Sequence, residues 1–291
     1  ALDELRRRHE ARLLAWMADA DGASPPASLQ QYCCHLGVPA RRRWAVWATL
    51  LRVATMPTLE AEAARVDALM RKPLADAEAL SADVQHAVGV LAEWLPAPFA
   101  ALLGDELVFV VRLLLSSLEI DYSPLLGLAP LGATLAVLLL QDISRSEGAS
   151  VYMLCERRSE LFNMLCAVLG NLSPALMSGK PWGLRDGVAA SSPPPSELLS
   201  YWGVLVQYWA PRLSERLRRE AMQPKLALAL SSLLAAKAAP PALARLLELG
   251  VLGATPRLTL QPMLLLALVV AHEEALAAAD DDDAVCAAFE A

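Results

Sequence analysis

The sequence predicts an all-α fold. Hydrophobic residues make up 56% of the 291 residues, and Ala and Leu, both good helix formers, supply most of that fraction. Long alternations of β-branched and polar residues, which are typical of strands, are missing. Apolar residues instead recur at helical spacing between Pro and Gly breaks. We therefore expect a helical protein with a large core.

The first third of the sequence predicts amphipathic helices separated by short breaks. The breaks contain Ser24-Pro25-Pro26, Gly37-Val38-Pro39 and Met56-Pro57. Ser28 is a suitable N-cap for the second helix. The expected helices cover residues 2–19, 28–36, a segment that begins after Pro39, 59–70 and 81–95.

The chain is organised around the stretch from Glu119 to Leu140, which follows an apolar helix expected over 99–117. A polar turn at 121–124, in which we expect Tyr122 to be exposed, precedes an apolar run at 125–140. As a helix this run is about 24 Å long, which is less than the roughly 30 Å of a bilayer core. It also contains Gly127 and Pro130. A buried core helix is favoured, and no transmembrane segment is expected.

The second half predicts a helix over about 151–169 and then an irregular segment. The Pro-rich loop near 190–195 is interpreted as a long loop or an internal boundary. An acidic turn at 280–283 and a last short helix ending near Phe289 close the chain. Further helices are expected at 197–218, 223–237, 241–249 and 258–278. We divide the chain into an N-terminal helix and linker (1–27), a main domain (28–278) and the acidic turn with the C-terminal helix (279–291).

Charge and cysteine usage restrict the class of function. The net charge of −7 argues against nucleic acid as a partner. Two arginine triplets, at 6–8 and 41–43, are better interpreted as solvated helix faces than as anion sites. An odd number of cysteines, five, without a C-x-x-C pair is typical of reduced, intracellular thiols, and no signal peptide is visible, so we expect a cytoplasmic protein.

Common enzyme signatures are missing from the sequence. There is no phosphate-binding loop, no G-x-G-x-x-G, no G-x-S-x-G and no H-E-x-x-H. The four histidines are scattered along the chain. We therefore expect no cofactor and no metal, and the bulk properties alone indicate a helical binding or scaffold protein.

One composite pattern resembles the opening motif of TBC domains, the family of Rab GTPase-activating proteins. That family has G-I-P-x-x-x-R-x-x-V-W-x-x-L-L, and residues 37–51 match its spacing through Gly37, Arg43 and Trp47. Trp44 stands where the family usually has Gly. Residues 147–154 and 244–266 are similar to later family segments, although the W-D pair of the second one is missing. The resemblance covers most of residues 28–278 and implies an all-α TBC domain of two helical lobes.

The resemblance also assigns the two catalytic finger positions. Leu80-x-x-Asp83-x-x-His86 resembles the family's I-x-x-D-x-x-R, and Tyr122-Ser123-Pro124 resembles its Y-x-Q. In TBC domains the Arg and the Gln of these motifs act on the GTP of a bound GTPase, and an arginine finger is worth about 10³ to 10⁵ in rate. Here His86 and Pro124 replace them.

The function implied is binding of a GTP-bound, Rab-type small GTPase, with weak, atypical or absent GTPase activation, in membrane or ciliary trafficking. Asp83, Tyr122, Ser123 and Arg43 are the expected partner-binding residues. Residues 122–128 (YSPLLGL) are similar to a divergent TBC subgroup that is joined to WD repeats and associated with centrosomes and cilia, which adds ciliary or centrosomal proteins as partners and these sites as locations. Three alternatives stay open: a scaffold without a GTPase partner, an activator that uses Arg41, Arg42 or Arg43, and an unrelated helical enzyme.

Overall fold

In the part of the chain that the computed structural model describes, the secondary structure consists of helices joined by turns, and no strand occurs there. This confirms the all-α prediction. In that same part, no helix is long and apolar enough to cross a bilayer. The described residues are 2–19, 29, 32–33, 36–94, 97–123, 127–144, 152–172, 195–220, 222–223, 225–226, 230, 240–250, 257–279, 281 and 284–285.

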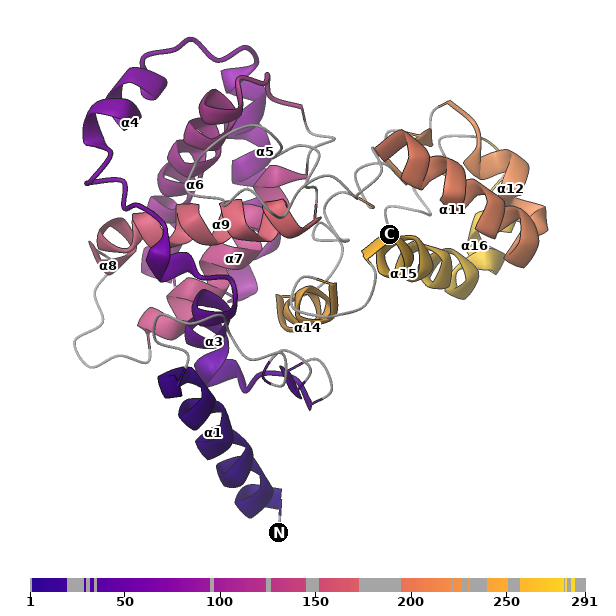
Figure 1. Ribbon diagram of the computed structural model, residues 1–291. Coiled ribbons are helices and arrows are strands. Elements are labelled where there is room, and N and C mark those ends of the chain that lie inside the picture. The colour runs from indigo at the N-terminus through magenta and orange to yellow at the C-terminus, as the bar shows by residue number, and fades with distance from the viewer. Residues whose placement is uncertain are drawn as a thin grey trace.

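The larger group of helices is formed by the first 172 residues (Figure 1). Short 3₁₀ turns η1, η2 and η3 occur at Ala40–Arg42, Val53–Thr55 and Ala92–Trp94. The α-helices are α1 (Leu2–Asp19), α3 (Arg43–Leu50), α4 (Ala63–Met70), α5 (Ala77–Val90), α6 (Ala97–Leu118), α7 (Leu128–Ile143), α8 (Tyr152–Glu156) and α9 (Arg158–Leu172).

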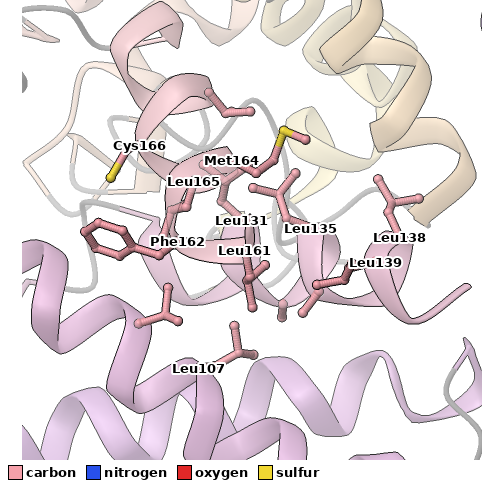
Figure 2. Packing of buried hydrophobic residues seen from close by; sticks show 14 of the residues in the cluster. Leu107, Leu131, Leu135, Leu138, Leu139, Leu161, Phe162, Met164, Leu165 and Cys166 are labelled. Carbon is pink, nitrogen blue, oxygen red and sulfur yellow. The ribbon is translucent and has the colours of Figure 1, made fainter. Parts of the chain in front are cut away.

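Helix α7 is the centre of this group because it is apolar on every side. A helix without a polar face is stable only when other helices surround it. Helices α3, α5, α6, α9 and α14 all pack against α7. Figure 2 shows Leu131, Leu135 and Leu139 of α7 beside side chains of α9 and Leu107 of α6. The predicted core helix is therefore confirmed, although it begins at Leu128.

A second group of helices has its own set of buried residues, which includes Trp202, Val206, Leu213, Leu265 and Val269. These residues come from helices that follow residue 194 in the sequence (Figure 1). Its helices are α11 (Pro195–Trp209), α12 (Pro211–Leu217), α15 (Arg257–Ala271) and α16 (Glu273–Ala278).

Helix α14 (Pro240–Gly250) returns to the first group although its sequence neighbours belong to the second. Leu243, Ala244 and Leu247 are buried in the same cluster as α7. In Figure 1 the helix lies between the two groups. The chain thus enters the second group at α11, leaves it for α14 and enters it again at α15.

Several predicted boundaries differ from the structure. The helix expected at 59–70 begins at Ala63, because residues 59–62 form turns. The helix expected at 99–117 begins at Ala97, so Pro98 lies in its first turn, where proline is tolerated because the first N–H groups of a helix have no partner within the helix. The helix expected at 151–169 is two helices that meet at Arg157. The predicted linker at 20–27, the Pro-rich loop up to residue 194, most of the helix at 223–237 and most of 280–291 lie outside the described residues.

Candidate functional site

Asp83 and His86 lie on helix α5, one turn apart. The helix forms readily because Ala residues and Leu80 favour it, and its apolar positions Val84 and Val88 are buried against the core. Residues three apart share a helix face, so Asp83 and His86 point to the same side. Asp83 is half-buried and His86 is exposed. The position that resembles the arginine finger is therefore accessible to a partner.

Tyr122 lies in the segment that leaves α6, and its ring is only 5% exposed. The expectation of an exposed Tyr122 is wrong, because the ring is part of the hydrophobic core while its hydroxyl is satisfied inside the protein. That hydroxyl donates a hydrogen bond of 2.5 Å to Oδ2 of Asp83. Burial, followed by this carboxylate, raises the pKa of Tyr122 far above its ordinary value of 10.0.

The hydrogen bond joins two segments that are 39 residues apart in the chain. The segment that resembles D-x-x-R and the segment that resembles Y-x-Q therefore lie in contact. Ser123, next to Tyr122, is half-buried. Pro124, the residue at the glutamine position, lies outside the described residues. The sequence indicated both segments as candidates, but nothing in it indicated that Tyr122 and Asp83 form a hydrogen bond with each other.

Arg43 is held by a buried carboxylate of α14. Its Nε donates to Oε1 of Glu248 at 2.9 Å, and its Nη2 donates to the carbonyl of Val38 at 3.3 Å. The Arg43 side chain is 14% exposed and that of Glu248 is 0% exposed. Arg43 thus has an intramolecular partner, and its role in partner binding stays a prediction.

The carboxylate of Glu248 accepts hydrogen bonds from three residues. Besides Arg43, it accepts a hydrogen bond from Nη1 of Arg245 at 2.9 Å and one from the N–H of Val38 at 3.3 Å. Arg245 Nη1 also donates to the carbonyl of Cys33 at 3.1 Å. This arrangement, the Glu248 cluster (Val38, Arg43, Arg245 and Glu248), ties the opening motif to α14. Sequence reasoning missed Glu248, since a single Glu on an amphipathic helix gives no sign of burial.

The arginines of the alternative finger, Arg41, Arg42 and Arg43, differ in what the structure describes of them, and the alternative stays a prediction. Nε of Arg42 donates to Oε1 of Glu10 on α1 at 2.8 Å, so Arg42 joins α1 to the start of α3. Arg43 is engaged by Glu248. The side chain of Arg41 lies outside the described residues. A finger must offer a guanidinium that is available to a phosphate, and both described arginines of the triplet already bind carboxylates.

Trp44, which stands at a position where the resemblance implies Gly, has a defined polar partner. The ring is 3% exposed, and its indole N–H donates to Oε2 of Glu160 at 3.0 Å. Arg157 binds the same carboxylate through Nε and Nη2, at 2.9 and 2.7 Å. Burial raises the pKa of Glu160, but the hydrogen bonds from Arg157 and Trp44 outweigh it, so the pKa lies below its ordinary value.

A further ion pair joins α6 to α9. Glu106 is 5% exposed and binds Nε and Nη2 of Arg158, whose guanidinium also lies 4.4 Å from the ring centre of Phe109. The sequence has two adjacent acidic residues here, the exposed Asp105 and the buried Glu106, and it does not indicate which of them is buried and needs a partner. Among the described residues, no group of three or more His, Cys, Asp and Glu side chains is arranged to hold a metal ion.

Comparison of the chain with protein-family models gives no match, and comparison with curated proteins gives none either.

Proposed function

We propose that the chain is a TBC-like domain that binds a GTP-loaded small GTPase of the Rab type and provides weak, atypical or no finger-based GTPase activation. The observation that carries this proposal is the hydrogen bond from Tyr122 to Asp83. Two fingers that act on one γ-phosphate have to be supplied by segments that lie next to each other. The contact between the two motif segments meets this requirement.

The exposed side chain of the α5 motif supports the same proposal. His86 follows Asp83 by one turn and is open to a partner, whereas the hydroxyl of Tyr122 is turned inward. In this arrangement Asp83 and Tyr122 fix the relative positions of the two segments, and His86 belongs to the surface that meets the GTPase. We therefore assign Asp83 and Tyr122 a positioning role rather than a direct contact.

The substitutions at the two fingers account for the proposed loss of catalysis. An imidazole is shorter than a guanidinium and does not form its planar, two-pronged hydrogen bond to phosphate oxygens. Proline has no side-chain donor or acceptor with which to hold a water molecule. Binding and positioning would remain, while charge stabilisation at the γ-phosphate would be lost.

A scaffold without a GTPase partner is the second candidate. Large apolar side chains are exposed on the second group of helices, among them Tyr208 at 80% and Val204 at 62%. Surfaces of this kind are typical of protein–protein contacts. A scaffold would bind protein partners through this surface and would not distinguish GTP-loaded from GDP-loaded GTPases.

The proposal extends to a place of action, which is the cilium or the centrosome. It is supported only by the resemblance of residues 122–128 to the subgroup joined to WD repeats. Imaging of the tagged chain in ciliated cells tests it. Enrichment at basal bodies or along cilia is expected, and an even cytoplasmic distribution would contradict this extension.

Restoring the fingers tests the proposed site. We expect the unmodified chain to leave single-turnover GTP hydrolysis by a panel of Rab-type GTPases almost unchanged. The double variant His86→Arg with Pro124→Gln is expected to accelerate hydrolysis by at least about tenfold for one member, a small part of the 10³ to 10⁵ that such a finger can supply.

Two controls accompany this assay. Gln85→Arg with Pro124→Gln adds the same charge at an exposed position on a different side of α5 and should remain inactive. Acceleration by the unmodified chain that His86→Ala abolishes would show that the site is active as it stands. A restored variant that is folded and binds a GTPase, but does not accelerate GTP hydrolysis, would argue against the alignment of the two finger positions.

A further inference from the structure

The outer face of α11 is apolar and exposed. Tyr201, Val204 and Tyr208 follow one another at intervals of three and four residues, so they line one side of the helix. Their exposed fractions are 45%, 62% and 80%, and Trp209 at the end of the helix is 60% exposed. Tyr and Trp are the residue types that most often dominate binding energy at interfaces. We call these four residues the α11 face.

The carboxyl end of the α11 face is bordered by arginines. Arg212 is exposed and follows Trp209 by three residues. Arg218 is exposed, and its Nη2 donates to Oε1 of Gln207 on α11 at 2.9 Å, which places it beside that helix. Glu215, also exposed, lies between the two arginines in the sequence of α12. Two positive charges against one negative charge make this border basic in a chain whose net charge is −7.

Helix α15 exposes a second apolar stripe with the opposite charge at its end. Met263 is 46% exposed and Val270 is 43% exposed, and the exposed Ala267 lies between them at helical spacing. Glu274, four residues beyond Val270 at the start of α16, is exposed as well. We call these four residues the α15 face. Like the α11 face, it consists of an apolar stripe with charge at its carboxyl end, but the charge here is negative instead of positive.

The two faces cannot meet within one molecule. Helices α11 and α15 pack against each other, and Trp202 and Val206 of α11 share a buried cluster with Leu265 and Val269 of α15. Tyr201, Val204 and Tyr208 on α11, and Met263, Ala267 and Val270 on α15, lie on sides of their helices that point away from this cluster, whereas Trp209 is at the last residue of α11. Figure 1 shows the two helices stacked, α11 above α15. A second copy of the chain can nevertheless present its α15 face to the α11 face of the first.

We propose that the chain associates with itself head to tail, with the α11 face of one copy seated on the α15 face of the next. The two helices run parallel, which brings Arg212 and Arg218 of one copy near Glu274 of the other. The aromatic rings of the α11 face cover Met263 and Val270. Because the two faces differ, the interface is heterologous, so association produces rings or open chains rather than a closed twofold dimer.

Sedimentation velocity over a range of micromolar concentrations tests this proposal. We expect the average mass to rise with concentration beyond that of a dimer. Tyr208→Ser is expected to raise the concentration of half-association by about tenfold or more, because it removes a large exposed anchor. Tyr152→Ser removes an equally exposed tyrosine, 76% exposed on α8, and should cause no change. A chain that is monomeric at every concentration would overturn the proposal.

Charge exchange then identifies the faces. Arg212→Glu and Glu274→Arg are each expected to weaken association a few-fold, and their combination in one chain should restore most of it, because the pair is recreated with reversed signs. Arg71→Glu, at an exposed position after α4, is the control for charge reversal. The proposal is overturned if neither charge exchange changes the association. It is also overturned if the chain stays monomeric and its α11 face binds anionic lipid vesicles instead.

Discussion

Tyr122 is the residue through which the two motif segments meet, and its hydroxyl accounts for that contact. Tyr122→Phe keeps the buried ring and removes the hydrogen bond to Asp83. We expect the free energy of unfolding to fall by about 2 kcal/mol, because a hydrogen bond to a charged group is lost and Asp83 keeps a poorly satisfied carboxylate. Urea denaturation measures this change. Tyr208→Phe alters an exposed tyrosine and should leave the stability unchanged within about 0.5 kcal/mol.

The raised pKa of Tyr122 predicts a dependence of stability on pH. The unfolded chain ionises this phenol near the ordinary value of 10.0, whereas the folded chain keeps it protonated to higher pH. The unfolded state therefore binds fewer protons above about pH 10, and the contribution of Tyr122 to stability, complete below that pH, declines as the pH rises. Denaturation between pH 8 and 11 should show a steeper decline for the unmodified chain than for Tyr122→Phe. Equal slopes would contradict the burial of the hydroxyl.

Helix α14 depends on Glu248 for its attachment to the opening motif. Glu248→Gln keeps the shape but removes the charge that Arg43 and Arg245 share. We expect a loss of about 3 kcal/mol in the free energy of unfolding, because Arg43 would remain largely buried without a counter-charge. Chemical denaturation is the measurement, and Glu215→Gln on the surface of α12 is the matched control. A loss as small as that of the control would show that the buried pair contributes little.

Helix α7 carries one buried polar group, which predicts a stabilising substitution. Thr134 is 0% exposed, and its Oγ1 finds no hydrogen-bond partner among the described residues. Thr134→Val has nearly the same shape and removes the unsatisfied hydroxyl, so we expect a gain of up to about 1 kcal/mol. Thr58→Val is the contrasting variant. The Oγ1 of Thr58 accepts a hydrogen bond from the N–H of Ala61 at 3.2 Å, so we expect this substitution to lower the stability. Thermal denaturation of the two variants distinguishes these outcomes.

For the molecule as a whole, the sequence predicted the helices whose pattern is local. The all-α class and the central helix α7 followed from Ala and Leu content and from an uninterrupted apolar run, and both are confirmed. The break at Arg157 and the late start of α4 were missed, since single-residue breaks and turns depend on tertiary packing rather than on periodicity. The position of α14 was missed for a similar reason, because an amphipathic helix does not specify which core its apolar face joins.

The candidate site could be predicted only in part. The spacing of Asp83, His86 and Tyr122 indicated which segments to compare, but whether Tyr122 faces solvent or core depends on a pairing across 39 residues. The same holds for Arg43, whose partner Glu248 is 205 residues away in the chain. Side-chain pairing over such distances leaves no trace in a single sequence.

Binding to a GTP-loaded Rab-type GTPase is the most direct test of the proposed function. The measurement is equilibrium binding of the chain to a panel of such GTPases, each loaded with GDP or with a non-hydrolysable GTP analogue. We expect at least one member to bind the chain about tenfold more tightly in the GTP form, and His86→Glu to weaken that binding because it adds negative charge near the phosphates. No binding to any member in either nucleotide state would contradict the proposal and favour the scaffold.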